Sequence, residues 1–143
     1  MIPARISIVT LGVRDMPAMR AFYRSLGWRE EGDSDSHSMF HTGGGVLALF
    51  PYDELAADAS VQISDDIGDY RGFTLAINLE SREDVDTAFE ALRDLGVRIT
   101  KEPVATEWGG YSGYFADPEG NLWEIAWGSF YSIDDRGGMI MHS

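Results

Sequence analysis

Cysteine is absent from this chain of 143 residues. Its absence excludes disulfides and thiolate metal sites, and it fits a reducing cytosol. Long apolar runs are also missing, and the opening stretch MIPARISIVTL lacks the pattern of a secretory signal. We therefore expect one soluble, cytoplasmic domain, long enough to bury roughly two thirds of the surface that its unfolded chain exposes.

Basic residues are scarce as well. The chain has 11 Lys and Arg against 24 Asp and Glu, which gives a formal net charge of −13. Binding to nucleic acid or to an anionic membrane needs clustered basic residues, so both classes of partner are excluded. The acidity would attract cationic small molecules, or it serves solubility alone, and the charge balance leaves both interpretations open.

What the chain does contain is one pattern that occurs twice. In the first half, a β-branched segment predicts a strand with Ile6, Ile8 and Thr10 on one face. Asp15 is the predicted N-cap of a helix that ends at Gly27. The predicted strands of this half are 5–13, 28–31, 38–42 and 46–50.

The same order of elements returns after residue 71. Ser81 is the predicted N-cap of a second helix, and Gly96 ends it as Gly27 ends the first. The chain is therefore an imperfect internal duplication. The strands predicted in this half are 73–79, 97–101, 110–116 and 121–127.

Two segments fall outside the repeat. Residues 53–71 hold six acidic residues against one basic residue and lack a clear period, which predicts a connecting loop. The segment is either a solvated linker or a flap over a site. The tail, 128–143, has apolar residues without period and includes His142. We expect it to pack on the body or at a contact between subunits.

The stretch GGYSGYFADPEGNLWEIAW predicts a hairpin that closes at Asp117-Pro118-Glu119-Gly120. If Ala116 faces Asn121, Glu124 shares a face with Tyr111, Gly113 and Phe115. Trp123 and Trp127 then belong to the core on the opposite face. A lone carboxylate over a partly apolar surface is a candidate handle for a ligand or a metal.

The doubled plan, the opening VTLGVRDMPAMRAFYRSLGW and the closing GYFADPEGNLWEI resemble the vicinal oxygen chelate superfamily, the glyoxalase/bleomycin-resistance/dioxygenase group. The resemblance covers about residues 5–127. It implies an α+β fold in which two βαβββ modules curl their sheets around a cleft. Residues 1–143 would form one such domain, with module one at about 5–52, the acidic linker at 53–71, module two at about 72–127 and the tail at 128–143.

Catalytic members of that superfamily hold a metal on four side chains from four strands. Carried over by position, the last ligand is matched by Glu124. The other positions fall on Ile8, with Ser7 or Thr10 in a shifted register, on Ala48, and on Thr74 or Phe73. One carboxylate with these neutral groups cannot hold zinc, nickel or iron tightly. We therefore expect no cofactor. The weak metal candidates are Glu124 and His41, and pairing of Thr42 with Val46 would put Phe40 beside Ala48 and His41 on the opposite face.

The resemblance and the aromatic residues together predict a metal-independent protein that binds a small aromatic or cationic organic molecule, with antibiotic sequestration as one such use. The alternative is a metal-dependent lyase, isomerase or dioxygenase of the glyoxalase type. Glu124 would anchor the ligand or, as the best catalytic candidate, act as a general base. The superfamily also implies a homodimer. The predicted ligand-binding residues are Phe40, Ala48, Phe50, Thr74, Trp108, Tyr111, Phe115 and Glu124.

Overall fold

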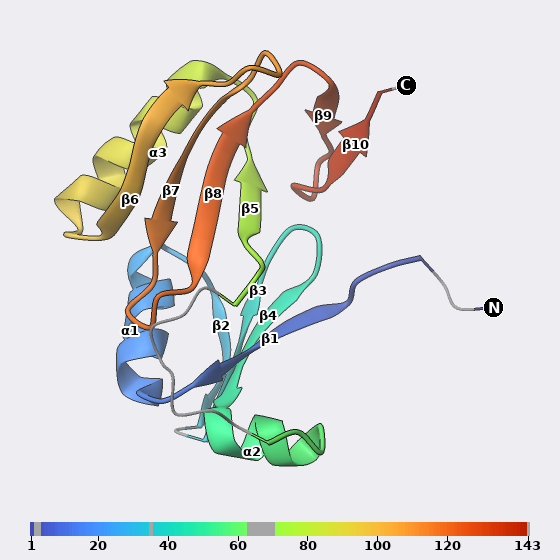
Figure 1. Ribbon diagram of the computed structural model, residues 1–143, viewed down its shortest axis with the longest axis vertical. Coiled ribbons are helices and arrows are strands. Elements are labelled where there is room, and N and C mark those ends of the chain that lie inside the picture. Colours follow the sequence, from blue (N-terminus) through green and yellow to red (C-terminus); the bar gives the residue numbers. More distant parts are fainter. Residues whose placement is uncertain (2–3, 35, 63–70, 143) are drawn as a thin grey trace. The chain divides into compact units, whose positions relative to one another are not determined.

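The computed structural model describes residues 1, 4–34, 36–62 and 71–142. The chain divides into two compact units, residues 1–67 and 68–143, and each is described by itself. The predicted α+β class is confirmed, with two four-stranded sheets and helices in both units (Figure 1). No helix in the described parts of the chain has the length and apolar character needed to cross a membrane.

The first unit contains one βαβββ module, as the sequence predicts. Its strands follow the order β1-β4-β3-β2, with β1 parallel to β4 and the other neighbours antiparallel. The elements are β1 (Ile8–Val13), α1 (Met16–Ser25), β2 (Glu30–Ser34), β3 (His37–His41) and β4 (Val46–Pro51).

Helix α1 covers one face of this sheet. The strand side chains beneath it are almost fully buried, and the ring of Tyr23 from α1 lies 5.8 Å from the ring of Phe40. The predicted helix ends are confirmed: Ala18 N–H donates to the Asp15 carboxylate at 3.0 Å, and Gly27 has a φ of +84°. This core contains Leu11, Val13, Met19, Tyr23, Phe40, Leu47 and Leu49.

The acidic segment after β4 begins with a helix, α2 (Tyr52–Asp58), so the prediction of a loop from residue 53 is wrong there. The helix packs on β1 and β4, where a Cβ on Gly12 would come within 2.9 Å of the Tyr52 ring. The Arg14 guanidinium lies 4.1 Å from the centre of the same ring. This packing orders a segment that has no clear period of its own. Residues 63–70 of the predicted linker lie outside the described residues.

The second unit repeats the plan, which confirms the predicted duplication. Its strands follow the order β5-β8-β7-β6, again with the first strand of the module parallel to the last. Ser81 caps α3 by accepting from Asp84 N–H at 3.0 Å, as predicted. The elements are β5 (Leu75–Asn78), α3 (Arg82–Asp94), β6 (Arg98–Ala105), β7 (Tyr111–Ala116) and β8 (Leu122–Trp127).

Helix α3 lies along one face of the second sheet (Figure 1). Its buried side chains are Val85, Phe89 and Leu92. A Cβ on Gly113 of β7 would approach the Phe89 ring to 2.6 Å, so glycine is required where this ring meets the sheet. The face of the sheet toward α3 is therefore the one that holds Gly113 and its partner Ile125.

The tail folds into a small hairpin of β9 (Tyr131–Ile133) and β10 (Met139–Met141). Its anchor is the buried Tyr131, whose hydroxyl donates to the carbonyl oxygen of Leu79 at 2.7 Å. The apolar residues of the tail thus belong to paired strands, which their lack of period did not predict. Packing on the body of unit two is confirmed for Tyr131.

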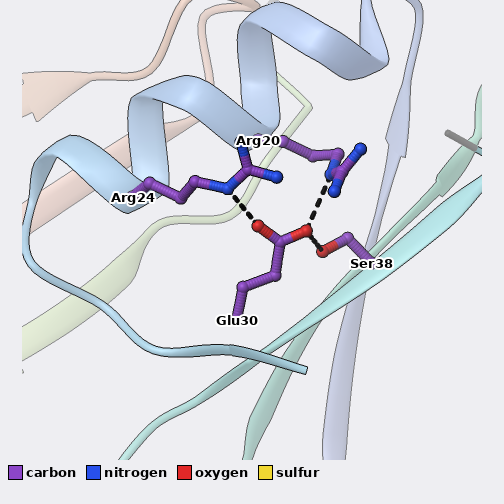
Figure 2. A network of polar contacts seen from close by, with 4 residues as sticks. All are labelled: Arg20, Arg24, Glu30 and Ser38. Carbon is purple, nitrogen blue, oxygen red and sulfur yellow. Dashed lines mark hydrogen bonds and ion pairs between the residues drawn. The ribbon is translucent and has the colours of Figure 1, made fainter. Parts of the chain in front are cut away.

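A buried ion cluster joins α1 to the sheet of the first unit (Figure 2). The Glu30 carboxylate accepts from Arg20 Nε and Ser38 Oγ, both at 2.7 Å, and it also pairs with Arg24. The side chains of Arg20 and Glu30 are only 8% and 9% exposed. Burial by itself raises the pKa of Glu30, but hydrogen bonds from Arg24, Ser38 and Arg20 outweigh it and lower that pKa to about 2.

We expect Glu30→Gln to lower the free energy of unfolding at neutral pH by about 3 kcal/mol, because it leaves a buried guanidinium without its counter-charge. Since folding lowers the pKa of Glu30 from 4.5 to about 2, its contribution is complete above pH 4.5 and is lost as the pH falls toward 2. Urea unfolding of both proteins across this pH range measures the difference.

The matched control is Glu31→Gln. Glu31 is the next residue, and its side chain is 52% exposed in its pairs with Arg29 and His41. We expect a much smaller loss of stability, because exposed ion pairs contribute little. Equal losses in the two variants, or a difference that does not change between pH 4.5 and 2, would contradict the role given to the Glu30 cluster.

Candidate functional site

The turn between β7 and β8 decides which side chains accompany Glu124. Asp117 N–H donates to the Asn121 carbonyl oxygen at 3.0 Å, so Asp117 rather than Ala116 faces Asn121. The Asp117 carboxylate also accepts from the Asn121 backbone and side-chain amides, at 2.9 and 2.7 Å. Gly120 ends the loop with a φ of +82°. The loop is one residue shorter than predicted, and the predicted register is wrong.

A shift of one residue moves every β7 side chain to the other face relative to β8. Ala116 pairs with Leu122, Phe115 with Trp123, and Tyr114 with Glu124. The neighbour of Glu124 is therefore Tyr114, so the prediction that Tyr114 lies on the opposite face is wrong.

Tyr111 and Phe115 lie on the face toward α3, so their prediction as residues beside Glu124 is wrong. Phe115 is 1% exposed, and its ring is parallel to that of Trp123 with the centroids 6.2 Å apart. The Tyr111 hydroxyl donates to the Asp86 carboxylate of α3 at 2.6 Å. This hydrogen bond raises the pKa of Tyr111, with burial as the second cause. Both aromatic side chains serve the packing of α3.

The glycine turn of the first unit shows a shift of the same kind. His41, not Thr42, pairs with Val46, because Thr42 N–H donates to the Gly45 carbonyl oxygen inside the loop. Phe40 consequently pairs with Leu47 in the core under α1 and is fully buried, so its predicted place beside Ala48 is wrong.

His41 lies on the same face as Ala48, whereas the sequence analysis put them on opposite faces. The reason is the same turn: Ala48 pairs with Met39, two residues from His41 along β3. The imidazole Nε2 lies 2.9 Å from Glu31 Oε1, and both side chains are about half exposed. The imidazole of His41 is therefore within hydrogen-bonding distance of the exposed Glu31 carboxylate.

The remaining predicted ligand-binding residues lie in different parts of the two units. Ala48 is 7% exposed, and Phe50 is half-buried at the end of the same sheet face, where it pairs with Gly12. Thr74 is exposed directly before β5. Trp108 lies in the loop between β6 and β7, where its ring packs edge-on against Phe130 with the centroids 5.7 Å apart. A ligand role for these four residues stays a prediction.

Strand β6 adds a basic group to the face of Glu124. A register shift between Ile99 and Lys101 lets Ile99 pair with Phe115 while Lys101 pairs with Tyr114. The next residue, Glu102, forms an ion pair with Arg93 of α3, which shows that it lies on the helix side. Lys101 therefore lies on the face away from α3, with Tyr114 and Glu124.

Ala76, Glu124, Tyr114 and Lys101 are successive partners across β5, β8, β7 and β6. We call Glu124, Tyr114 and Lys101 the cross-strand row. Glu124 and Tyr114 are half-buried, whereas Lys101 is exposed. Within the described parts of the chain, the side chains of Glu124 and Lys101 form no hydrogen bond or ion pair. Ala76 on the far side of Glu124 is exposed and contributes only a methyl group.

The residues present do not fit a tightly held divalent metal. Ile8, Ala48 and Thr74 supply no imidazole and no carboxylate, and among the described residues no three His, Cys, Asp or Glu side chains cluster as a metal site would require. Metals such as zinc need three or four nitrogen, sulfur or carboxylate ligands.

The comparisons with known proteins identify the family. The family model of the Glyoxalase/Bleomycin resistance protein/Dioxygenase superfamily matches residues 5–125. The chain belongs to this superfamily. The superfamily's name covers several activities, and the match itself does not select one of them. Among curated proteins, none matches the chain.

Solved structures of the superfamily share this fold. A glyoxalase-related enzyme from Fulvimarina pelagi is 27% identical with a TM-score of 0.86, covering 99% of this chain and 100% of that chain. A glyoxalase/bleomycin resistance protein/dioxygenase from Nocardioides is 26% identical with a TM-score of 0.78, covering 89% and 85%. A lactoylglutathione lyase from Agrobacterium tumefaciens, 23% identical with a TM-score of 0.67 and covering 88% and 95%, shows the fold alone.

The sequence contains a signal for the observed position of Tyr114. A three-residue hairpin loop commonly ends in a residue with positive φ, and Gly120 suits that position in a loop of Pro118 to Gly120. For Lys101 the only signal is Pro103, because proline inside a strand favours a bulge or an edge. The proline does not specify how many extra residues the bulge contains, so it does not predict which residue of β6 pairs with Tyr114.

The observed register makes a direct prediction about neighbouring residues of β7. Phe115→Ala should lower the free energy of unfolding by about 3 to 5 kcal/mol, because it leaves a cavity between Trp123 and α3. Tyr114→Ala should lower it by less than half as much, since Tyr114 is half-buried on the other face. Urea unfolding of the two variants measures both values, and the reverse order would show that the predicted register was right after all.

Proposed function

We propose that this member of the superfamily binds a small aromatic cation at Glu124 and Tyr114 of the cross-strand row, without a metal. Sequestration of an antibiotic is one biological use of such binding, and the superfamily's name includes bleomycin resistance. The observation that carries the proposal is the pairing of Glu124 with Tyr114 across β8 and β7.

The chemistry of this pair suits a flat cation. Directly paired residues of an antiparallel sheet have Cβ atoms about 5 Å apart, so one ligand can contact both side chains. The phenol ring offers a stacking surface and attracts positive charge, while the half-buried carboxylate offers a counter-charge. Since the described residues do not neutralise Glu124, its carboxylate is available to a ligand.

The rival function is a metal-dependent lyase, isomerase or dioxygenase. Two observations favour it: the similar protein from Fulvimarina pelagi is named a glyoxalase-related enzyme, and Glu124 matches the last metal-ligand position of the resemblance. The neutral side chains of Ile8, Ala48 and Thr74 weigh against it. The homodimer and the cytoplasmic location stay predictions.

Elemental analysis separates the two functions. We expect protein purified without chelator to contain far less than one equivalent of any transition metal, because three of the four carried-over ligand positions have no donor of the required kind. Incubation with zinc, nickel or iron followed by desalting should leave the content unchanged. A stoichiometric metal that disappears in Glu124→Gln would instead support the rival function.

Binding of proflavine, a flat fluorescent cation, tests the proposed site. We expect Glu124→Gln to weaken the affinity about tenfold, equivalent to about 1.4 kcal/mol, because it removes a charge while it keeps the shape. Fluorescence titration measures the dissociation constant. The matched control is Glu90→Gln, an exposed position on α3 that should bind as the parent does. Equal affinities of the parent and Glu124→Gln would exclude Glu124 as the anchor.

A further inference from the structure

The cross-strand row ends in the only lysine of the chain. Several arginines of the chain form ion pairs: Arg20 and Arg24 pair with Glu30, Arg29 with Glu31, and Arg93 with Glu102. Lys101 forms no ion pair with the described residues, although the chain carries 24 acidic ones. Lys101 is the basic residue of the cross-strand row, and binding of a cation alone leaves its position there unexplained.

The position of Lys101 relative to Glu124 is set by the sheet. One strand, β7, separates them, and both pair with Tyr114. Two strand spacings put their Cα atoms about 10 Å apart. A negative group and a positive group therefore flank one aromatic ring, and all three lie on the face away from α3.

Two observations agree with this placement of the lysine. The ion pair of Glu102 with Arg93 puts the residue after Lys101 on the helix side of β6. On the other side of the bulge, Arg98 pairs with Ala116, so it lies on the same face as Lys101. That face of β6 therefore carries two basic residues, and Arg98 likewise has no ion pair among the described residues.

We infer that the ligand is an aromatic zwitterion, with an ammonium group bound by Glu124 and a carboxylate or other anionic group bound by Lys101. The inference rests on the proposed function and narrows its ligand class. A ring in the middle of such a molecule would lie over Tyr114, while its charged ends meet side chains of opposite sign. The separation of those side chains suits charged groups on opposite ends of one benzene ring.

Three probes separate the contributions of the two charges. 4-(Aminomethyl)benzoate carries both groups, benzylamine has only the cation, and benzoate has only the anion. Because Lys101 is the sole lysine, reductive methylation with ¹³C-formaldehyde labels only its amine and the chain's N-terminus, and it keeps the positive charge. The dimethyl-lysine NMR signal then reports on the ligand's anionic end, and the N-terminal signal is an internal control.

We expect 4-(aminomethyl)benzoate to shift the Lys101 signal and to bind about fivefold more tightly than benzylamine, as for a solvated ion pair. Lys101→Gln should lower the affinity for 4-(aminomethyl)benzoate to the affinity for benzylamine. It should leave the binding of proflavine no weaker. The control Arg136→Gln changes an exposed cation in the turn between β9 and β10 and should have no effect. Circular dichroism and urea unfolding confirm that each variant is folded.

The outcomes distinguish two failures. If benzylamine binding depends on Glu124 but 4-(aminomethyl)benzoate leaves the Lys101 signal unchanged, the zwitterion is wrong and the proposed function stands. If benzylamine binds equally to the parent and to Glu124→Gln, both proposals fall. An equal effect of Lys101→Gln and Arg136→Gln also overturns the inference, because it would reflect net charge rather than a site.

Discussion

The backbone hydrogen bond between Asp117 and Asn121 fixes the relation of β7 to β8, and the composition of both sheet faces depends on it. The Asp117 carboxylate holds the loop by accepting two amides of Asn121. With this register, the large aromatic side chains gather under α3 while Tyr114 joins Glu124. The loop one residue longer that the sequence predicted would exchange the two sets and put Gly113 opposite Glu124 in place of Tyr114.

The two modules share one plan and differ in what they place on their sheets. In the first, the charged groups of Glu30, Arg20 and Arg24 neutralise one another beneath α1, and this cluster serves stability (Figure 2). In the second, Glu124 and Lys101 lie on opposite sides of Tyr114, and neither side chain forms an ion pair with a described residue. Our proposals therefore place the ligand on the second module.

Membership of the superfamily does not decide between binding and catalysis, because its members share the fold and differ in their side chains. The carried-over ligand positions keep one carboxylate, at Glu124, while Ile8, Ala48 and Thr74 contribute none. Our proposals therefore follow the side chains of this chain. They give Glu124 a role that its charge and its neighbour Tyr114 support without a metal.

The sequence by itself determined the elements: the α+β class, the duplication, the caps at Asp15 and Ser81 and the family, because these follow from local pattern and turn chemistry. It did not determine the faces of Phe40, Phe115 and Tyr111, the helix α2 or the pairing of Lys101. Side-chain direction alternates with every residue, so one residue more in a loop or bulge reverses it. Only the hydrogen bonds and packing of the tertiary structure determine how many residues each loop or bulge contains.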